Sequence, residues 1–258
     1  YGQKIPTNGN YQLNARLVNA RILNADNFIP SALYPPALME QIVTDFADVK
    51  IFNLSVNSSR ATRWVHMSQW AATIDRLMHN NDKLFIISSG NIKNSSVYAQ
   101  FPGILQHLSA GRNYPDYLME RSCGIANPAF SGFALTVGSV GHIKFNEPDR
   151  ESFADMDNPS AFTRTGPGMW GMIKPDIVEY GGDWVREKNP APNLSVVSNV
   201  GAELIQTTSG GRPAVGFDIG TSFAAPKVTH IAAAILHEVP NATSNLLRAL
   251  LVQSGRLP

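Results

Sequence analysis

Short runs of β-branched and aliphatic residues alternate along this chain with longer amphipathic stretches. Buried strands of a parallel sheet are short apolar runs, and the helices that cover such a sheet carry apolar residues at three- and four-residue steps. The alternation predicts a three-layer α/β fold with a mostly parallel central sheet. The expected strands are residues 15–23, 50–54, 83–87, 134–140 and 176–179, and the expected helices are residues 37–46, 64–79, 222–237 and 243–253.

The chain has 258 residues, which is enough for one large domain or two small ones. No internal repeat, low-complexity tract or long linker interrupts it. We therefore expect a single domain over residues 1–258. Residues 94–128 fit the strand and helix alternation poorly because they mix turn residues with short helical pieces, and we expect them to form an insertion on the surface.

Charge and cysteine content exclude several classes of partner. Lys and Arg total 21 and Asp and Glu total 20, so a net charge of +1 provides no field for nucleic acid or an anionic membrane. No apolar run reaches the roughly 18 residues that a membrane helix needs. A single cysteine, Cys123, cannot form an internal disulfide and leaves the cellular compartment open. We expect neither a nucleic-acid nor a membrane partner.

Two patterns that could hold a cofactor or a metal fail on their context. Gly166, Gly168 and Gly171 have the spacing of a dinucleotide fingerprint, but Pro167 lies inside it and no strand-to-helix turn surrounds it. Three aspartates of one turn-rich segment lack the spacing of a calcium loop: Asp149, Asp155 and Asp157. The sequence therefore predicts no cofactor and no metal site.

The strongest chemical motif is the run Gly-Thr-Ser-Phe-Ala-Ala-Pro at residues 220–226, which leads into an alanine-rich helix. A serine in the first helical turn lies near free backbone N–H groups and the positive end of the helix dipole, which suits a nucleophile whose product is an oxyanion. In isolation, an ordinary N-cap is the better explanation of Thr221 and Ser222. Pro226 inside the first turns is an unusual start for a buried helix, and it favours the catalytic interpretation.

Two further segments carry polar residues at the ends of expected strands. Residues 85–91 form a buried run that ends in Ser88, Ser89, Gly90 and Asn91, and an asparagine side chain can donate to a developing oxyanion. Residues 51–58 form a strand that opens into a polar loop. A turn and a routine strand end are the alternative explanations.

Taken together, the three segments resemble the subtilisin-like serine proteases, the subtilases. Residues 220–226 are similar to the family's Gly-Thr-Ser-Met-Ala-Ala-Pro signature with phenylalanine in place of methionine. Residues 173–178 resemble its Lys-Pro-Asp-Val stretch, and residues 134–140 resemble its Ala-Ile-Thr-Val-Gly-Ala-Val strand. The resemblance extends from about residue 15 to the C-terminus.

The resemblance implies a role for each matching residue. Ser222 would be the nucleophile and Asn91 the side-chain donor of the oxyanion hole. The remaining matches are substrate-binding residues on the pairing edge, the pocket wall and the nucleophile turn: Ser55, Val56, Asn57, Ser88, Ser89, Gly90 and Thr221. The chain departs from the family where Val-Asn-Ser replaces Leu-Gly-Gly at residues 56–58. The small residues at 88–90 suggest an apolar pocket of moderate size.

The family's general base and orienting carboxylate have no counterpart here. Subtilases carry the histidine in a His-Gly-Thr motif, and none of the six histidines lies in one. We expect these histidines to occupy exposed helix positions, or a packing position in the case of His230. Asp26 follows the expected strand at residues 15–23. This region matches a later strand of the family than the one that carries the orienting aspartate, so we reject Asp26 as the orienting acid.

We therefore expect Tyr1 to lie downstream of the family's aspartate strand and histidine helix, which would belong to the natural protein as a companion segment of the same domain. The first hypothesis is an endopeptidase acting on peptide or protein substrates, with base and acid supplied from residues before Tyr1 and no activity from the 258 residues alone. The alternative is a non-catalytic relative that retains a peptide-binding groove or acts as a scaffold.

Overall fold

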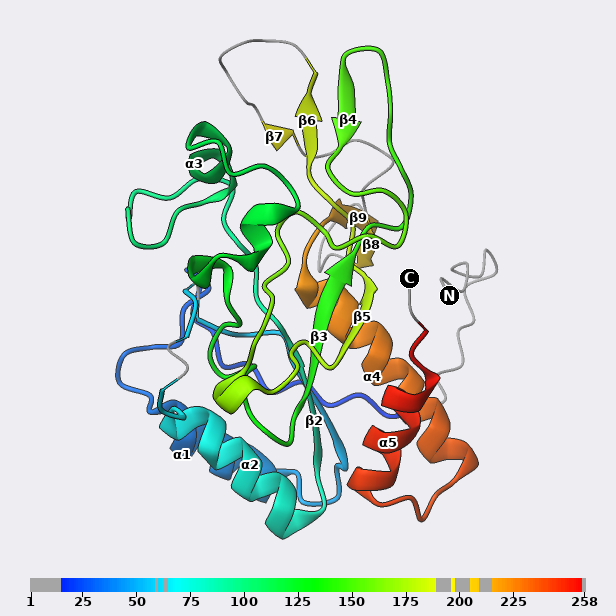
Figure 1. The fold of residues 1–258 in the computed structure, drawn as a ribbon. Coiled ribbons are helices and arrows are strands. Elements are labelled where there is room, and N and C mark those ends of the chain that lie inside the picture. Colours follow the sequence, from blue (N-terminus) through cyan, green and yellow to red (C-terminus); the bar gives the residue numbers. More distant parts are fainter. Residues whose placement is uncertain are drawn as a thin grey trace.

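The computed structural model describes residues 15–58, 60–62, 65–188, 196–197, 205–208 and 215–256. Its helices and strands, shown in Figure 1, are α1 (Pro35–Asp45), β1 (Ile51–Leu54), α2 (Gln69–Asn81), β2 (Leu84–Ser88), α3 (Ile104–Ser109), β3 (Leu135–Val140), β4 (Arg150–Ser152), β5 (Ile177–Tyr180), β6 (Val185–Glu187), β7 (Val196–Val197), β8 (Ile205–Thr208), β9 (Val215–Asp218), α4 (Thr221–Glu238) and α5 (Ser244–Ser254). Three short 3-10 helices complete it: η1 (Asp116–Met119), η2 (Arg121–Cys123) and η3 (Met169–Gly171).

A four-stranded parallel sheet forms the centre of the molecule, in the order β1-β2-β3-β5. All residues of β2 and β3 are buried, because these two strands are covered on both faces, which is why they are continuous apolar runs in the sequence. The flanking strands β1 and β5 are only partly buried. Four of the five expected strands and the mostly parallel sheet are confirmed, with boundaries shifted by one residue.

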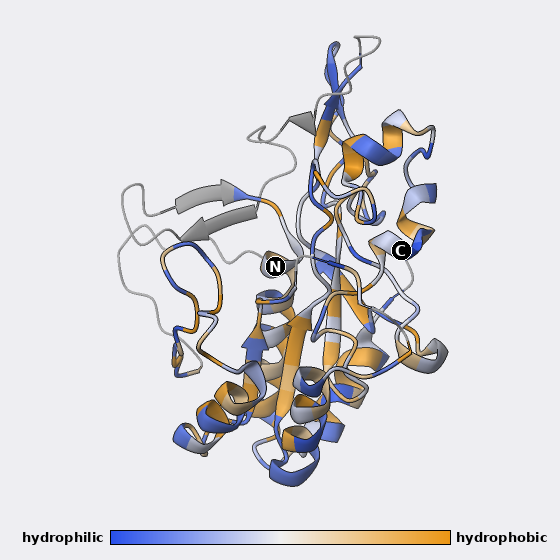
Figure 2. Ribbon diagram, turned by 90° about the vertical axis from the view of Figure 1, so that its left-hand side faces the viewer, coloured by the Kyte–Doolittle hydropathy of each residue, from blue (hydrophilic) through white to orange (hydrophobic). Residues whose placement is uncertain are grey.

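Helices cover both faces of this sheet. Helix α4 packs across β1, β2, β3 and β5, and α5 packs beside it. Helices α1 and α2 pack on each other on the opposite side. Figure 2 shows the hydrophobic strands between these helices, whose outer faces are more hydrophilic. The three-layer α/β architecture is therefore confirmed.

The second helix begins later than its apolar periodicity suggests. The Ser68 hydroxyl accepts a hydrogen bond from the Ala71 backbone N–H at 3.1 Å, so Ser68 caps the helix and the first helical residue is Gln69. The expected start at Trp64 lies outside the described residues. Periodicity marks the face that a helix buries, whereas the cap decides where the helix begins.

The expected strand at residues 15–23 is wrong. The structure places no strand there, and the side chain of Leu17 is 80% exposed. β-branched and aliphatic residues favour a strand only where a neighbouring strand and a covering layer bury them. Within the described residues nothing pairs with this segment, and the outer edge of β1 carries no further strand.

Residues 94–128 contribute α3, η1 and η2, which lie away from the central sheet in Figure 1. They pack in a second apolar core that includes Tyr117, Cys123 and, from a later part of the chain, Phe162. The expectation that they form an insertion within a single domain stays a prediction.

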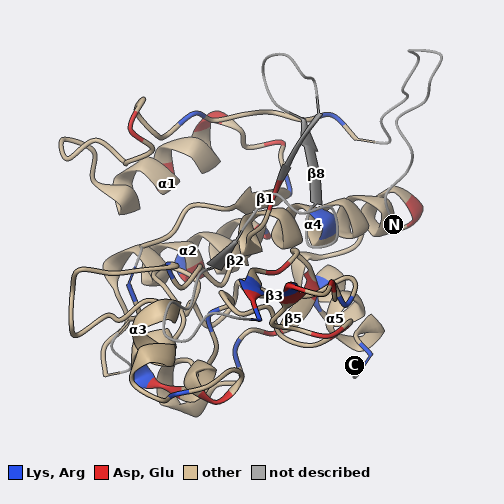
Figure 3. Cartoon of the chain, turned by 90° about the horizontal axis from the view of Figure 1, so that it is seen from above, with Lys and Arg blue, Asp and Glu red and all other residues tan. Residues whose placement is uncertain are grey.

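Charged residues of both signs lie close together around β3 and β5, as Figure 3 shows from above. Buried Lys174 there forms a salt bridge with Asp176 at 2.7 Å, and Arg248 reaches the same carboxylate at 3.1 Å. The Lys-Pro-Asp stretch therefore contributes to the packing of α5 on the sheet. In the described ranges no helix has the length and hydropathy to cross a membrane, and no group of three metal-ligating side chains was found there.

Candidate active site

Ser222 lies in the first turn of α4, at the edge of the sheet where the parallel strands end. Its Oγ donates to the Ser55 carbonyl oxygen at 3.3 Å, and the Ser55 Oγ donates to the Ser222 carbonyl oxygen at 3.3 Å. These reciprocal contacts join the end of β1 to the start of α4. The half-buried hydroxyl thus lies where parallel α/β sheets place their reactive groups.

The residue before this turn must be glycine. Gly220 has φ of 153°, and a Cβ atom at this position would lie 3.1 Å from Asn91 Nδ2. Only a residue without a side chain adopts this conformation while the amide approaches so closely. The first residue of the signature therefore creates the space between α4 and Asn91.

Asn91 is held with its amide nitrogen toward the nucleophile turn. Its Oδ1 accepts hydrogen bonds from the Thr221 backbone N–H at 3.0 Å and from Thr221 Oγ1 at 2.8 Å. Because Oδ1 is engaged twice, Nδ2 remains to face Gly220. Thr221 is fully buried and fixes the amide, while Asn91 itself is exposed and accessible from solvent.

A second segment locks Asn91 from behind. Asn91 forms an antiparallel bridge with Thr163, and the backbone N–H of Arg164 donates to the Gly90 carbonyl oxygen at 3.2 Å. The Ile92 backbone N–H donates to the Phe162 carbonyl oxygen at 2.7 Å. This pairing makes the amide part of a rigid framework, which is the condition for a preorganised oxyanion donor.

Two polar segments lie close to one another near Ser222. Ser55, Val56 and Asn57 follow β1 and are half-buried, and the Asn57 amide donates to Ser88 Oγ at 2.9 Å. This contact links the expected pairing edge to the expected pocket wall. The structure therefore brings the sequence-predicted site residues together around the start of α4.

Side chains from three other segments pack closely around Gly90. A Cβ atom on Gly90, whose φ is 98°, would lie 2.7 Å from Ala126 Cβ, 2.9 Å from Arg164 Cδ and 3.2 Å from Asn57 Oδ1. The space beside Gly90 is thus filled by these three side chains, and the apolar pocket expected at residues 88–90 stays a prediction. Ser88 and Ser89 are fully buried, and within the described residues the Ser89 hydroxyl has no hydrogen-bond partner.

Sequence reasoning missed Arg164. It lies 3% exposed behind Gly90, and its Nη1 donates to the carbonyl oxygens of Ser122 at 3.0 Å and Gly124 at 3.1 Å. Burial lowers the pKa of Arg164 to about 10, an effect that Cys123 partly opposes. One sequence signal could have identified Arg164: it is an arginine between two threonines in a segment of otherwise small and apolar residues.

No histidine or carboxylate among the described residues forms a hydrogen bond to the Ser222 hydroxyl. Four of the histidines are exposed: His66, His79, His237 and, contrary to its expected packing position, His230. His107 is 1% exposed, contrary to the expected exposed position, because α3 turns it into the second core beside Cys123. Among the described residues, Ser222 and Asn91 therefore lie together at the start of α4 without a histidine or carboxylate on the Ser222 hydroxyl.

A serine at a helix N-terminus, opposite a fixed amide donor and at the carboxyl edge of a parallel sheet, is the arrangement of a hydrolase with a serine nucleophile. The peptidase S8 model, described as the subtilase family, matches residues 8–256. The chain belongs to the subtilase family.

Individual relatives agree with this assignment. An uncharacterized protein, y4bN of Sinorhizobium fredii, is 29% identical over 242 residues, which cover 86% of this chain and 53% of that protein. The serine protease AprX of Bacillus subtilis is 29% identical over 152 residues, or 58% of this chain and 29% of that protein. The chain thus spans about half, or less, of the length of these relatives.

Among solved structures, one of the proteases from Pseudoalteromonas arctica has a TM-score of 0.48 and 17% sequence identity to this chain. The match covers 81% of this chain and 44% of that chain.

Proposed function

We propose that this chain is the nucleophile-bearing part of a serine endopeptidase. Ser222 Oγ attacks the carbonyl carbon of a peptide bond, and its proton passes to a base. The carbonyl oxygen becomes an oxyanion that Asn91 Nδ2 and the Ser222 backbone N–H stabilise. The base returns the proton to the leaving amine, and water then releases the acyl group from Ser222.

The observation that carries this proposal is the fixed orientation of Asn91. Thr221 engages its oxygen through two hydrogen bonds, which leaves the donor end facing the turn before Ser222. An N-cap serine would not need an amide from a different strand held in this orientation. Removing one such donor lowers kcat by roughly 10²–10³-fold in enzymes that depend on it.

The substrate backbone would add as a strand along Ser55, Val56 and Asn57. These residues continue β1 beyond the sheet, and main-chain hydrogen bonds from an added strand give affinity with little dependence on substrate sequence. The side chain before the scissile bond would then lie beside the joined segments at residues 55–57 and 88–90. The Asn57–Ser88 hydrogen bond keeps these two segments at a fixed spacing.

The base and its orienting carboxylate would come from a companion segment that this sequence does not contain. The outer edge of β1 supports this part of the proposal, because β1 ends at Leu54 and the next residue, Ser55, contacts the Ser222 hydroxyl through its carbonyl oxygen. A strand paired with this edge would end beside the nucleophile. On this proposal the 258 residues have no peptidase activity without that segment.

Labelling of the full-length protein with a fluorophosphonate probe tests the nucleophile. We expect covalent labelling that Ser222→Ala abolishes. Ser244→Ala is the matched control, because Ser244 also lies in the first turn of a helix, α5, and should leave labelling intact. A full-length protein that binds peptides but does not react with the probe would favour the peptide-binding alternative.

A further inference from the structure

The crevice next to Ser222 lies between the continuations of two neighbouring strands. β1 and β2 pair in parallel up to Leu54 and Ile87, so residues 55–57 and 88–90 continue from adjacent strand ends. Ligands of open parallel sheets bind in the crevice outside such strand ends. A substrate at Ser222 therefore meets both continuations.

The proposed reaction fixes where one substrate side chain begins, and the inference below rests on that proposed function. The attacked carbonyl carbon lies at Ser222 Oγ, which contacts the end of β1 at Ser55, and the carbonyl oxygen turns toward Asn91. The side chain before the scissile bond is attached to the carbon next to the attacked one. It therefore starts at the crevice between residues 55–57 and 88–90.

The side chain of Asn57 closes this crevice. Its Nδ2 donates to Ser88 Oγ at 2.9 Å and to the Ser88 carbonyl oxygen at 3.4 Å, and a Cβ atom on Gly90 would lie 3.2 Å from Asn57 Oδ1. One side chain thus reaches from the first continuation to the second. Asn57 itself is half-buried, whereas Ser88, Ser89 and Gly90 are buried. The expected pocket wall is therefore covered by protein.

The other side of Gly90 is closed as well. A Cβ atom there would lie 2.7 Å from Ala126 Cβ and 2.9 Å from Arg164 Cδ. Both neighbours are held in place, because the Ala126 backbone N–H donates to the Ser89 carbonyl oxygen and Arg164 Nη1 donates to the Ser122 carbonyl oxygen. Ala126 and Arg164 are buried, so Asn57 is the more accessible of the three groups around Gly90.

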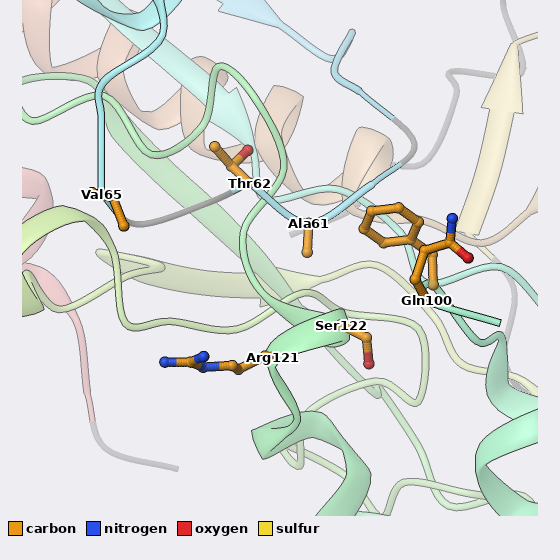
Figure 4. Close-up of a pocket in the computed structure, with 7 residues that line it drawn as sticks. Ala61, Thr62, Val65, Gln100, Arg121 and Ser122 are labelled. Atoms are coloured by element: carbon orange, nitrogen blue, oxygen red, sulfur yellow. The ribbon is translucent and has the colours of Figure 1, made fainter. Parts of the chain in front are cut away.

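A separate pocket of about 430 Å³ lies on the far side of residues 125–126. Figure 4 shows its lining, which includes Ala61 and Arg121 but no residue of the two continuations. Ala61 forms an antiparallel bridge with Ala126, which in turn pairs with Ser89. Because this segment separates the pocket from the crevice, the pocket offers no room to a side chain that starts at Ser222.

We propose that Asn57 is a specificity-determining residue that selects substrates with glycine or alanine directly before the scissile bond. Glycine has no side chain and alanine ends at Cβ, so neither needs the space that Asn57 occupies. A leucine or phenylalanine side chain has to displace the Asn57 amide from Ser88. Such a clash discriminates against the wrong substrate without any additional contact to the right one.

The sequence shows where this closure comes from. In the resemblance to the subtilases, Asn57 lies at the first glycine of the Leu-Gly-Gly pattern, and a glycine has no side chain that could bridge to Ser88. Asn57 does not have a positive φ, so glycine and alanine are both compatible with its backbone. Substitution can therefore open the crevice without straining the chain.

Quenched fluorescent peptides that differ only at the residue before the cleaved bond test the selection in the full-length protein. We expect kcat/KM for the alanine peptide to exceed that for the leucine peptide by about tenfold or more. The glycine peptide should likewise exceed the phenylalanine peptide. Mass spectrometry of the products identifies the cleaved bond. Cleavage of the leucine peptide as fast as the alanine peptide would overturn the proposal.

Variants assign the selection to its residue. Asn57→Gly and Asn57→Ala should each raise kcat/KM for the leucine peptide by about tenfold, which brings the alanine-to-leucine ratio to about one. Misfolding does not produce such a gain. Asn81→Ala is the matched control, because the Asn81 amide also donates to a protein oxygen, that of Leu77 in α2, and its loss should leave the ratio unchanged. A ratio that survives both Asn57 variants would contradict the assignment.

Binding separates this inference from the proposed function. The alanine and leucine peptides are titrated into the full-length Ser222→Ala variant, where we expect the alanine peptide to bind about tenfold more tightly. Adding Asn57→Ala should remove the difference. That result supports the closed crevice even if the natural protein hydrolyses neither peptide. Equal binding would overturn the inference, while equal hydrolysis of the two peptides would overturn it and leave the peptidase proposal standing.

Discussion

Ser222 and Ser122 both have polar partners, but their surroundings differ in kind. Ser222 lies in the first turn of a long helix and faces the Asn91 amide, and among the described residues its hydroxyl forms a hydrogen bond with the Ser55 carbonyl oxygen alone. Ser122 lies in the short helix η2, with Oγ at 3.4 Å from Nε2 of His107. Proximity to a histidine alone would select Ser122.

The hydrogen bonds of His107 argue against Ser122 as a nucleophile. Arg112 Nε donates to His107 Nδ1 at 2.9 Å, so the neutral ring carries its hydrogen on Nε2 and donates toward Ser122 and Cys123. Burial lowers the pKa of His107, and the charge of Arg112 lowers it further. A histidine that cannot accept a proton does not activate a neighbouring hydroxyl, so His107 does not serve Ser122 as a general base. Ser222 faces Asn91, the proposed oxyanion donor, and on the proposed function its base comes from a companion segment.

The largest expected effect tests this contrast directly. In the full-length protein, Ser222→Ala should lower kcat/KM for peptide hydrolysis by about 10³-fold or more, because the covalent route is lost. His107→Gln should change kcat/KM by less than about threefold, since the imidazole lies outside the site. Steady-state kinetics on one peptide measures both, with folding checked by circular dichroism. A collapse of activity in folded His107→Gln would show that the second cluster is catalytic.

Asn91→Ala should have the next largest effect, a loss of about 10²-fold in kcat with little change in KM, because the amide acts when the oxyanion forms. Asn81→Ala is the matched control, since the Asn81 amide donates to the Leu77 carbonyl oxygen at the end of α2. The comparison would need revision if both variants lost activity equally, or if Asn91→Ala changed KM alone.

The next prediction concerns Asp183, a buried carboxylate whose protonation affects stability on the side of the second core. Burial raises its pKa to about 7, although backbone N–H groups, among them those of Ala154 and Ala161, oppose this shift. The folded protein therefore binds this proton more tightly than the unfolded chain. Its contribution to stability falls as the pH rises from about 4 to about 7.

Urea unfolding of the wild type and Asp183→Asn across this pH range measures the effect. As the pH rises from about 4 to about 7, the unfolding free energy of the wild type should fall relative to that of Asp183→Asn by a few kcal/mol, with about 4 kcal/mol as an upper limit. Asp45→Asn, which changes an exposed carboxylate at the end of α1, should show no such trend relative to the wild type. A pH-independent difference for Asp183→Asn would show that this carboxylate stays ionised throughout.

The smallest effect concerns Cys123. Burial raises the pKa of its thiol to about 11, so the thiolate that reacts with alkylating agents is scarce near neutral pH. Iodoacetamide should leave the folded protein unmodified and react fully after urea denaturation, as intact mass reports. Rapid alkylation of the folded protein would mean that the second core opens readily.

Local sequence predicted the elements whose stability depends on local pattern. The β2 and β3 runs are apolar throughout because they are buried on both faces, and the 220–226 signature specifies its own turn through Gly220. Residues 15–23 have the same composition as a strand, yet the structure leaves them unpaired. Strand formation depends on a neighbour, and no local pattern reports whether one is present.

The sequence by itself determined the α/β layers and the family signature, and it singled out Ser222 and Asn91 as the candidate nucleophile and oxyanion donor. Only the tertiary structure decided that Arg164 lies behind Gly90, that His107 faces Cys123 in the second core and that Thr221 orients the Asn91 amide. The physical reason is that apolar periodicity and turn chemistry act between near neighbours in the chain. Charge, tautomer and pocket shape depend instead on groups that folding brings together from distant segments.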